Sequence, residues 1–306
     1  MSVDKIFFEK QNPFLQLLII ILPINFKHTI MKKLLFASSL LFAANMGIAQ
    51  VKMPAPSSTQ TIKQDFALGT IELIYSRPSI KGRKIFGDLV PFYTVWRTGA
   101  NSATILKFND AVEIGGKKID TGSYALYTIP TATSWEIILN KGTSNWGTNG
   151  YKESDDVVRL KLPSMLMASS IETFSMQFAN IKPESCELHI MWDKTAIAIP
   201  IKALIKDRMR ASIEKALEGE KKPYWQAAQF YNEYDKNNEK ALANITSAVS
   251  ANPKAYWMFL YKAKIELAMG DKNAAMESSK KSLVLAKEDK NEDYVKMNED
   301  LLKKIK

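Results

Sequence analysis

Three groups of side chains in this sequence have types and spacing that could do chemistry: a lone histidine, a run of carboxylates, and a run of arginines. His189 is the only histidine after residue 49, and Cys186 is the only cysteine. This pair is too small a set for a zinc site with the usual nitrogen and sulfur ligands. No G-x-S-x-G pattern accompanies His189, which argues against Ser-His-Asp catalysis. We therefore expect His189 on the surface of a strand and Cys186 as a buried, inert thiol.

The carboxylates lie in "YKESDDVVRL", residues 151–160, as Glu153, Asp155 and Asp156. A glycosidase or a calcium site uses such groups. Adjacent aspartates in an extended chain point to opposite faces, however, and the glycine of an EF-hand loop is missing. A solvated turn is the favoured interpretation. No P-loop or G-x-G-x-x-G motif is present, so we predict no catalytic residue, no metal and no cofactor.

The arginines lie in "YSRPSIKGRKIFGDLVPFYTVWRTGAN", residues 75–101. Its glycines permit sharp turns, and its apolar content is too high for disorder, so the segment should fold back over neighbouring strands. Guanidinium groups held on such a frame suit an anionic or hydroxyl-rich ligand. The alternative is that the arginines pair with Asp88, Glu72 or backbone carbonyls and only hold the loop down. The predicted ligand-binding residues are Arg77, Lys81, Arg83, Trp96, Arg97, Asn101 and Trp146.

The elements that must position these residues change character along the chain. From residue 61 to about 201, apolar residues alternate with period two, as in "TIELIYS", which predicts half-buried strands. Gly115-Gly116 suits a two-residue hairpin turn. Many short strands without helical patterns between them indicate an antiparallel sandwich or barrel.

After residue 201 the pattern becomes helical. Ala241 recurs as Ala275, 34 residues later, which is the tetratricopeptide length. The predicted fold class is therefore α+β: an antiparallel β-sandwich followed by a tetratricopeptide-like helical domain. The two tryptophans of this part, Trp225 and Trp257, are expected in the core. Tyr231 and Tyr261 are the predicted partner-binding residues.

The N-terminal region predicts export. "MKKLLFASSLLFAANMGIAQ", residues 31–50, has the basic, apolar and small-residue regions of a signal peptide cleaved near Ala49 and Gln50. The apolar run at residues 14–24 falls short of the roughly 20 residues that cross a bilayer. We expect residues 1–30 to be a spurious extension, 31–49 the signal peptide, 50–201 the β domain and 202–306 the helical domain, with an uncleaved anchor as the alternative. The mature protein would be periplasmic or secreted, without an integral membrane span.

The net charge of +10 is spread thinly along the chain, whereas a nucleic-acid binder concentrates its basic residues. We therefore predict no nucleic-acid partner.

Three stretches carry a family resemblance: the arginine segment at residues 75–101, "TGSYALYTIP" and "NWG". Over about residues 52–201 the sequence resembles an exported family, domain of unknown function 2911, common in the Bacteroidetes. The resemblance implies a signal peptide, a β-rich domain and often a helical, tetratricopeptide-like tail. It implies no activity, ligand or catalytic residue.

These observations favour a non-enzymatic, ligand-binding β-sandwich coupled to a helical module that docks a partner protein. Two alternatives stay open. One is a hydrolase acting on an exported glycan or acylated polymer through Glu153, Asp155, Asp156 and His189. The other is a structural component of an envelope complex, in which the arginines only hold the loop down.

Overall fold

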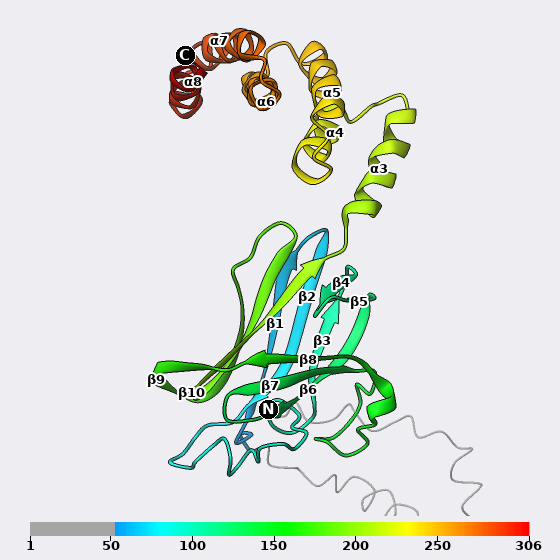
Figure 1. The fold of residues 1–306 in the computed structure, drawn as a ribbon, viewed down its shortest axis with the longest axis vertical. Coiled ribbons are helices and arrows are strands. Elements are labelled where there is room, and N and C mark those ends of the chain that lie inside the picture. The colour runs from blue at the N-terminus through cyan, green and yellow to red at the C-terminus, as the bar shows by residue number, and fades with distance from the viewer. Residues whose placement is uncertain (1–52, 306) are drawn as a thin grey trace, which may run out of the picture. The chain divides into compact units, whose positions relative to one another are not determined.

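The computed structural model describes residues 53–305. The predicted signal peptide, its cleavage site and the upstream extension lie outside the described residues. Within them the fold is α+β, with antiparallel sheets followed by six helices (Figure 1). No helix of residues 53–305 is long and apolar enough to cross a membrane.

The larger sheet has six antiparallel strands, and its alternating burial follows the sequence pattern. On β2, Ile71, Leu73 and Tyr75 are buried, as the period of two predicts. The middle of β6 is different because Ala125, Leu126 and Tyr127 are all buried, so both faces of the sheet are covered there. In spatial order the strands are β1 (Ser58–Phe66), β2 (Gly69–Arg77), β3 (Thr104–Phe108), β6 (Gly122–Pro130), β7 (Ser134–Asn140) and β8 (Asp156–Pro163).

The second sheet is built around a strand that folds back on itself. Its order is β5 (Lys117–Ile119), β4 (Val112–Ile114), β10 (Ser185–Ala203) and β9 (Met165–Ala179). The 19 residues of β10 would span about 60 Å if straight. Yet the N–H of Ala203 donates to the carbonyl of Glu184 at 2.8 Å, so the ends of β10 are adjacent. The chain turns at Asp193, where φ is 50° and the register with β9 shifts.

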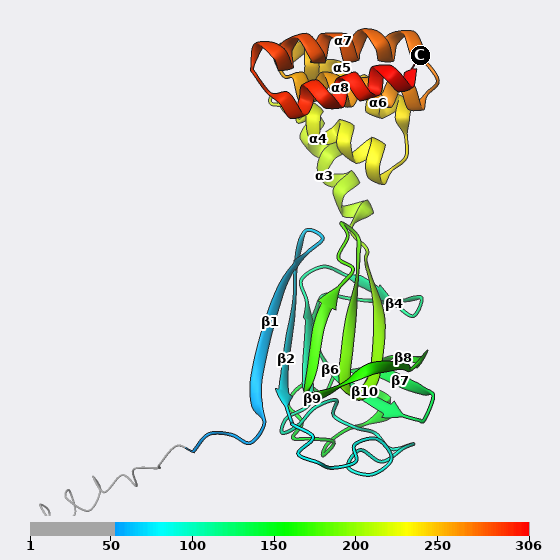
Figure 2. The same cartoon turned by 90° about the vertical axis from the view of Figure 1, so that its left-hand side faces the viewer.

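Side chains from both sheets share one hydrophobic core. Leu73, Leu106 and Ile137 of the larger sheet belong to the same cluster as Leu188 and Ile199 of β10. On β2 and β3 these residues alternate with more exposed ones, which is the pattern expected of strands covered on one face, whereas consecutive residues of β7 are buried on both faces. Figure 2 shows the long connection between β2 and β3 as cyan loops at one end of the strands.

The helices have cores of their own. Ala241 of α5 and Ala275 of α7 are both completely buried, so the small residues that recur 34 positions apart lie where helices pack closely. Trp225 packs against this core, but Trp257 is 40% exposed, so the prediction of a core position was wrong for Trp257. The helical elements are α3 (Lys206–Glu218), α4 (Tyr224–Gln229), the π-helix η2 (Phe230–Tyr234), α5 (Asn238–Ala251), α6 (Tyr256–Ala268), α7 (Lys272–Glu288) and α8 (Glu292–Ile305).

Candidate functional site

The connection between β2 and β3 is bonded to two strands far away in the sequence. The N–H of Ile80 donates to the carbonyl of Glu172 in β9 at 2.9 Å. Trp96 and Thr128 of β6 exchange two backbone hydrogen bonds, of 2.7 and 2.9 Å. The segment that contains the predicted ligand-binding residues is therefore a fixed frame on the β-rich part of the chain.

Trp96 is a packing residue of this frame. Its ring stacks on Trp192 with centroids 6.0 Å apart and meets Trp135 and Phe174 edge-on. The indole N–H donates to the carbonyl of Gly99 at 3.1 Å, so its polar atom is satisfied within the loop. Aromatic contacts of this kind stabilise a fold beyond the area that they bury. Trp96 thus fastens the loop to the core.

Arg77 and Arg83 also hold the loop in place, which is the role that the sequence left open as an alternative. Arg77 donates to the carbonyl of Phe174 at 3.1 Å and to the hydroxyl of Ser175 at 2.8 Å. Arg83 donates to the carbonyls of Ser79 and Ile80 at 2.5 and 2.9 Å. These bonds use the guanidinium groups that a ligand would otherwise contact.

Lys81 and Asn101 do not converge with these arginines on a shared pocket. Lys81 is exposed, and its backbone N–H donates to the carboxylate of Glu172 at 2.9 Å. The amide of Asn101 donates to the carbonyl of Ser57 and to the hydroxyl of Ser76, both at 3.2 Å. Asn101 therefore ties the loop to the start of β1.

Arg97 is different because its guanidinium is partly buried without being satisfied. Its Nε is buried and has no hydrogen-bond partner in the described part of the chain. An unpaired buried donor costs about 1–3 kcal/mol, so such groups are uncommon in folded proteins. The Nη1 atom lies against Gly147, where an added Cβ would come within 2.8 Å of it. The loop at residues 141–150 is thus packed directly on the guanidinium.

Thr98, the residue after Arg97, has a backbone conformation that a β-branched side chain disfavours. Thr98 has a φ of 54°, which is rare for a β-branched residue, and it is completely buried. Its hydroxyl bonds to that of Thr128 at 3.1 Å, and its carbonyl accepts from the hydroxyl of Thr104 at 2.6 Å. Strained residues held by their surroundings cluster at functional sites. Here the strained turn determines where Arg97 points.

Trp146 lies in the loop that packs on Arg97, and its side chain is 67% exposed. A β-bridge joins Trp146 to Ser102, and the N–H of Ala103 donates to the carbonyl of Asn145 at 3.2 Å. The structure therefore places Gly147, the residue after Trp146, against the guanidinium of Arg97, whereas Arg77 and Arg83 bond to β9 and to their own loop.

Two further polar groups, which the sequence analysis did not predict as ligand-binding residues, hold the loop that packs on Arg97. The hydroxyl of Tyr127, on β6, accepts from the amide of Asn145 at 3.1 Å and donates to the carbonyl of Gly147 at 3.4 Å. Burial raises the pKa of Tyr127, which stays protonated. We call the set Arg97, Tyr127, Asn145, Trp146 and Gly147 the Arg97 site.

The carboxylates of residues 153–156 form a structural network rather than a facing pair. Asp156 accepts from Asn140 at 2.7 Å, from Tyr151 at 2.8 Å and from Arg159 at 3.1 Å, and its side chain is 6% exposed. Glu153 pairs with the same Arg159 at 2.9 Å. Asp156 and Glu153 thus converge on one guanidinium, while no side-chain hydrogen bond or ion pair of Asp155 is found among the described residues. Residues 53–305 contain no cluster of three or more potential metal ligands.

Arg159 extends this network to β7, where it binds Glu136 through two hydrogen bonds of 2.9 and 3.0 Å. These bonds lower the pKa of Glu136. His189 lies on β10, in the other sheet, and contacts Glu187 at 2.7 Å. Nothing in these contacts joins His189 to the carboxylates of residues 153–156.

Residues 57–201 match a family of unknown function. Its description reads protein of unknown function (DUF2911). No curated protein and no solved structure matches the chain. The matched range includes every residue of the Arg97 site and ends before the helices, so the site belongs to the part that resembles the family.

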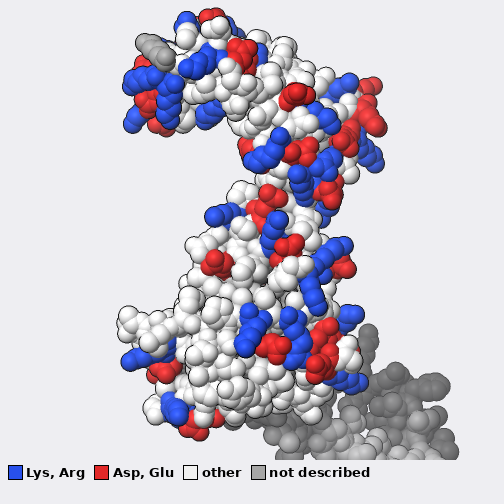
Figure 3. Space-filling view, viewed as in Figure 1, with Lys and Arg blue, Asp and Glu red and all other residues white. Residues whose placement is uncertain are grey.

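The surface charge offers no second candidate on the face drawn in Figure 3, where basic and acidic side chains lie beside one another and form no patch of a single sign. Interspersed charge of this kind keeps a protein soluble without creating a field for a polyanion.

Proposed function

We propose that this protein is an exported, non-enzymatic binding protein, and that its β domain holds an anionic, hydroxyl-rich ligand at the Arg97 site. The observation that carries the proposal is the buried Nε of Arg97, which lacks an acceptor and lies in the same site as the exposed indole of Trp146. A carboxylate of the ligand would bind the Nη atoms of the same guanidinium, because the Nε atom itself is buried.

The chemistry of the site favours a sugar acid. A guanidinium binds a carboxylate through two parallel hydrogen bonds, which gives both affinity and orientation. An exposed indole offers a flat apolar face to a ring, and the partly exposed amide of the neighbouring Asn145 adds a hydrogen-bonding group for hydroxyls. A neutral sugar would leave the guanidinium unpaired, and a simple anion would leave the indole uncovered.

The test is a thermal-shift titration with glucuronate, glucose and acetate. A ligand that prefers the folded state raises the melting temperature, and we expect glucuronate to do so more than either fragment. Arg97→Gln should abolish the glucuronate shift. Lys84→Gln, which removes an exposed charge from the same loop, should leave it unchanged. An equal shift in the Arg97→Gln variant would remove this residue from the site and overturn the proposal.

The helical part, residues 202–306, is proposed to be a tetratricopeptide-like module that docks a partner protein. Support comes from the buried small residues that recur 34 positions apart and from aromatic groups near the surface. Tyr261 donates to Glu233 at 2.7 Å and accepts from Asn232 at 3.0 Å, while its ring meets Trp225 edge-on. Tyr231 is 3% exposed and lies in the core, so it offers a partner no surface.

Trp257, on the same helix as Tyr261, is the residue through which docking can be measured. Its exposed ring is the kind of side chain that contributes most to protein interfaces. Peptides selected against the full chain from a displayed library should lose binding when Trp257 is replaced by alanine. Replacing the exposed Val284 of α7 should have no effect. Peptides that bind both variants equally would exclude this face.

A further inference from the structure

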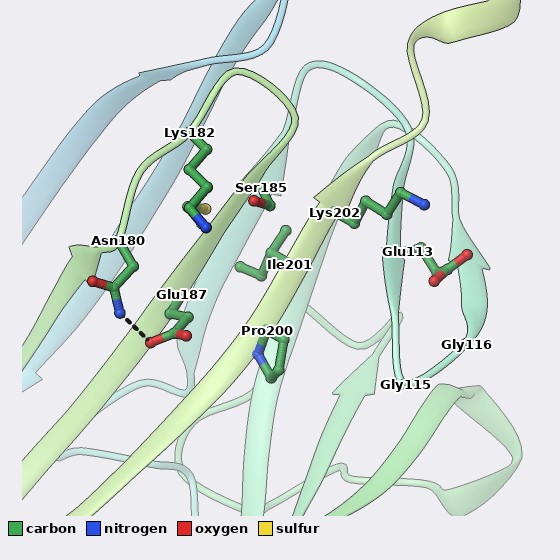
Figure 4. Close-up of a pocket in the computed structure, with 11 residues that line it drawn as sticks. Glu113, Gly115, Gly116, Asn180, Lys182, Ser185, Glu187, Pro200, Ile201 and Lys202 are labelled. Carbon is green, nitrogen blue, oxygen red and sulfur yellow. Dashed lines mark hydrogen bonds between the residues drawn. The ribbon is translucent and has the colours of Figure 1, made fainter. Parts of the chain in front are cut away.

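A concave surface lies on the four-stranded sheet, and none of its lining residues belongs to the Arg97 site. It is a hollow of about 450 Å³ between the β4–β5 hairpin and the loop that joins β9 to β10 (Figure 4). Pro200 of β10 lies exposed in the middle of the hollow, whereas the side chain of Ile201 beside it is buried in the core. Binding sites for small molecules commonly have volumes of about 300–1,000 Å³, so the hollow has room for a small ligand.

The sequence explains why the sheet opens at this point. Strand β10 pairs with β4 only at Lys202 and Ala203. Two residues before Lys202 in the same strand is Pro200. Proline has no N–H to donate, so it cannot continue a ladder. On the other side, Gly115 and Gly116 turn the β4–β5 hairpin with φ values of 60° and 75°. The two strands therefore separate and leave the hollow between them.

Four charged side chains surround the floor in two pairs of opposite sign. Figure 4 shows Lys182 and Glu187 on the side of the β9–β10 loop, and Lys202 and Glu113 on the side of the β4–β5 hairpin. Lys202 and Glu113 are also direct partners in the register of the two strands. Each side of the hollow thus presents one ammonium and one carboxylate.

Glu187 is the best fixed of these four groups. The amide of Asn180 donates to its carboxylate at 2.8 Å, and the ring of His189 contacts the same oxygen at 2.7 Å. These hydrogen bonds, first that of His189 and then that of Asn180, lower the pKa of Glu187 and keep it ionised. A carboxylate held in position by neighbours loses less entropy when it binds a cation.

We propose that this hollow binds a small zwitterion with an ammonium and a carboxylate group at its two ends, the chemistry of a free dipeptide. The ammonium pairs with Glu187, the carboxylate pairs with Lys202 across the floor, and Pro200 contacts the apolar part between them. A ligand with only negative charge would meet Glu113 and Glu187, and one with only positive charge would meet both lysines. The mixed lining therefore selects against each.

The experiment is a nuclear magnetic resonance titration of the full chain with alanyl-alanine, its N-acetylated form and its C-terminal amide. Alanyl-alanine should shift the amide signals of residues that line the hollow, and each capped form should bind about threefold more weakly, as expected for loss of one exposed ion pair. Glu187→Gln should abolish the discrimination against the acetylated form. Lys202→Met should abolish the discrimination against the amide.

Two controls separate this site from other causes. Lys194→Met removes an exposed charge elsewhere on β10 and should leave all three titrations unchanged. Arg97→Gln should also leave the three titrations unchanged. Binding at the hollow and binding at the Arg97 site can therefore fail independently of each other. Equal binding of free and capped dipeptides, or no saturable shift at the lining residues, would overturn the proposal.

Discussion

Replacing Gly147 with alanine tests whether the loop at residues 141–150 positions the guanidinium of Arg97. Gly147 has a φ of 67°, in the left-handed region, where an L-residue costs about 1–2 kcal/mol. The new Cβ would lie 2.8 Å from Nη1 of Arg97, closer than two such atoms can approach. Because the guanidinium ends a flexible side chain, it should move away rather than unfold the loop.

Gly82 provides the matched control. Its φ of 70° is nearly the same, and an added Cβ would meet nothing within 4 Å. Gly82→Ala therefore introduces the backbone cost without displacing a neighbour. Both variants should lose about 1–2 kcal/mol of unfolding free energy, or roughly 2–8 °C in melting temperature. Only Gly147→Ala should also lose the glucuronate response.

The two measurements are urea denaturation, for the unfolding free energy, and the thermal-shift titration with glucuronate. If Gly147→Ala keeps the full glucuronate shift, the position of the guanidinium does not create the site, and the reasoning fails. If Gly147→Ala loses several kcal/mol more than Gly82→Ala, the guanidinium cannot yield, and Arg97 is a structural support instead of a ligand group.

Three other expectations follow from contacts in the β-rich part. Trp96→Ala should lower the free energy of unfolding, measured by urea denaturation, by about 3–5 kcal/mol because the ring of Trp96 packs among aromatic residues. Trp146→Ala should change it by no more than about 0.5 kcal/mol. Similar losses in the two variants would contradict their different roles. The hydrogen bonds of Arg159 hold the pKa of Glu136 below its ordinary value of 4.5, so the stability from this pair is complete above pH 4.5 and is lost as the pH falls through the lowered pKa. Arg159→Ala should lower the free energy of unfolding by about 2 kcal/mol at pH 7 and weaken its fall at acid pH. An unchanged fall at acid pH would show that the Arg159–Glu136 pair does not cause it. Cys186 is 2% exposed, and burial raises the pKa of its thiol to about 11. A chromogenic disulfide at pH 8 should therefore label Cys186 only in urea, and labelling in buffer would indicate local opening.

The strands were predictable because their signal is local. Alternation in "TIELIYS" is enough to predict the buried residues of β2, and the two apolar runs within residues 185–203 correspond to the two arms of β10. Both patterns depend only on neighbours in the sequence. The fold of the loop at residues 75–101 was predicted from the same kind of signal, since its apolar residues had to be covered.

The partners of the arginines were not predictable because they come from distant parts of the chain. Arg77 bonds to Phe174 and Ser175, almost one hundred residues away, and nothing in its own segment indicates that contact. Likewise, Tyr127 and Asn145 join the Arg97 site through the approach of two loops across the larger sheet. The only signal for these two residues in the sequence was the family resemblance, since Tyr127 lies in "TGSYALYTIP" and Asn145 in "NWG".

The contrast among the arginines of this loop is the strongest argument that Arg97 has a role beyond packing. Arg77 and Arg83 end on carbonyl or hydroxyl acceptors, so holding the loop in place fully explains them. Two features of the loop work against stability: the buried Nε of Arg97 has no acceptor within the described chain, and Thr98 beside it is in the left-handed region. Each feature costs about 1–3 kcal/mol, so a loop selected only for stability would contain neither. A glycine at position 98 and a shorter uncharged side chain at position 97 would relieve both costs. The anchored arginines and the aromatic contacts of Trp96 stabilise the frame and offset these costs, and the Nε of Arg97, unpaired among residues 53–305, is the one feature of the frame that packing does not explain.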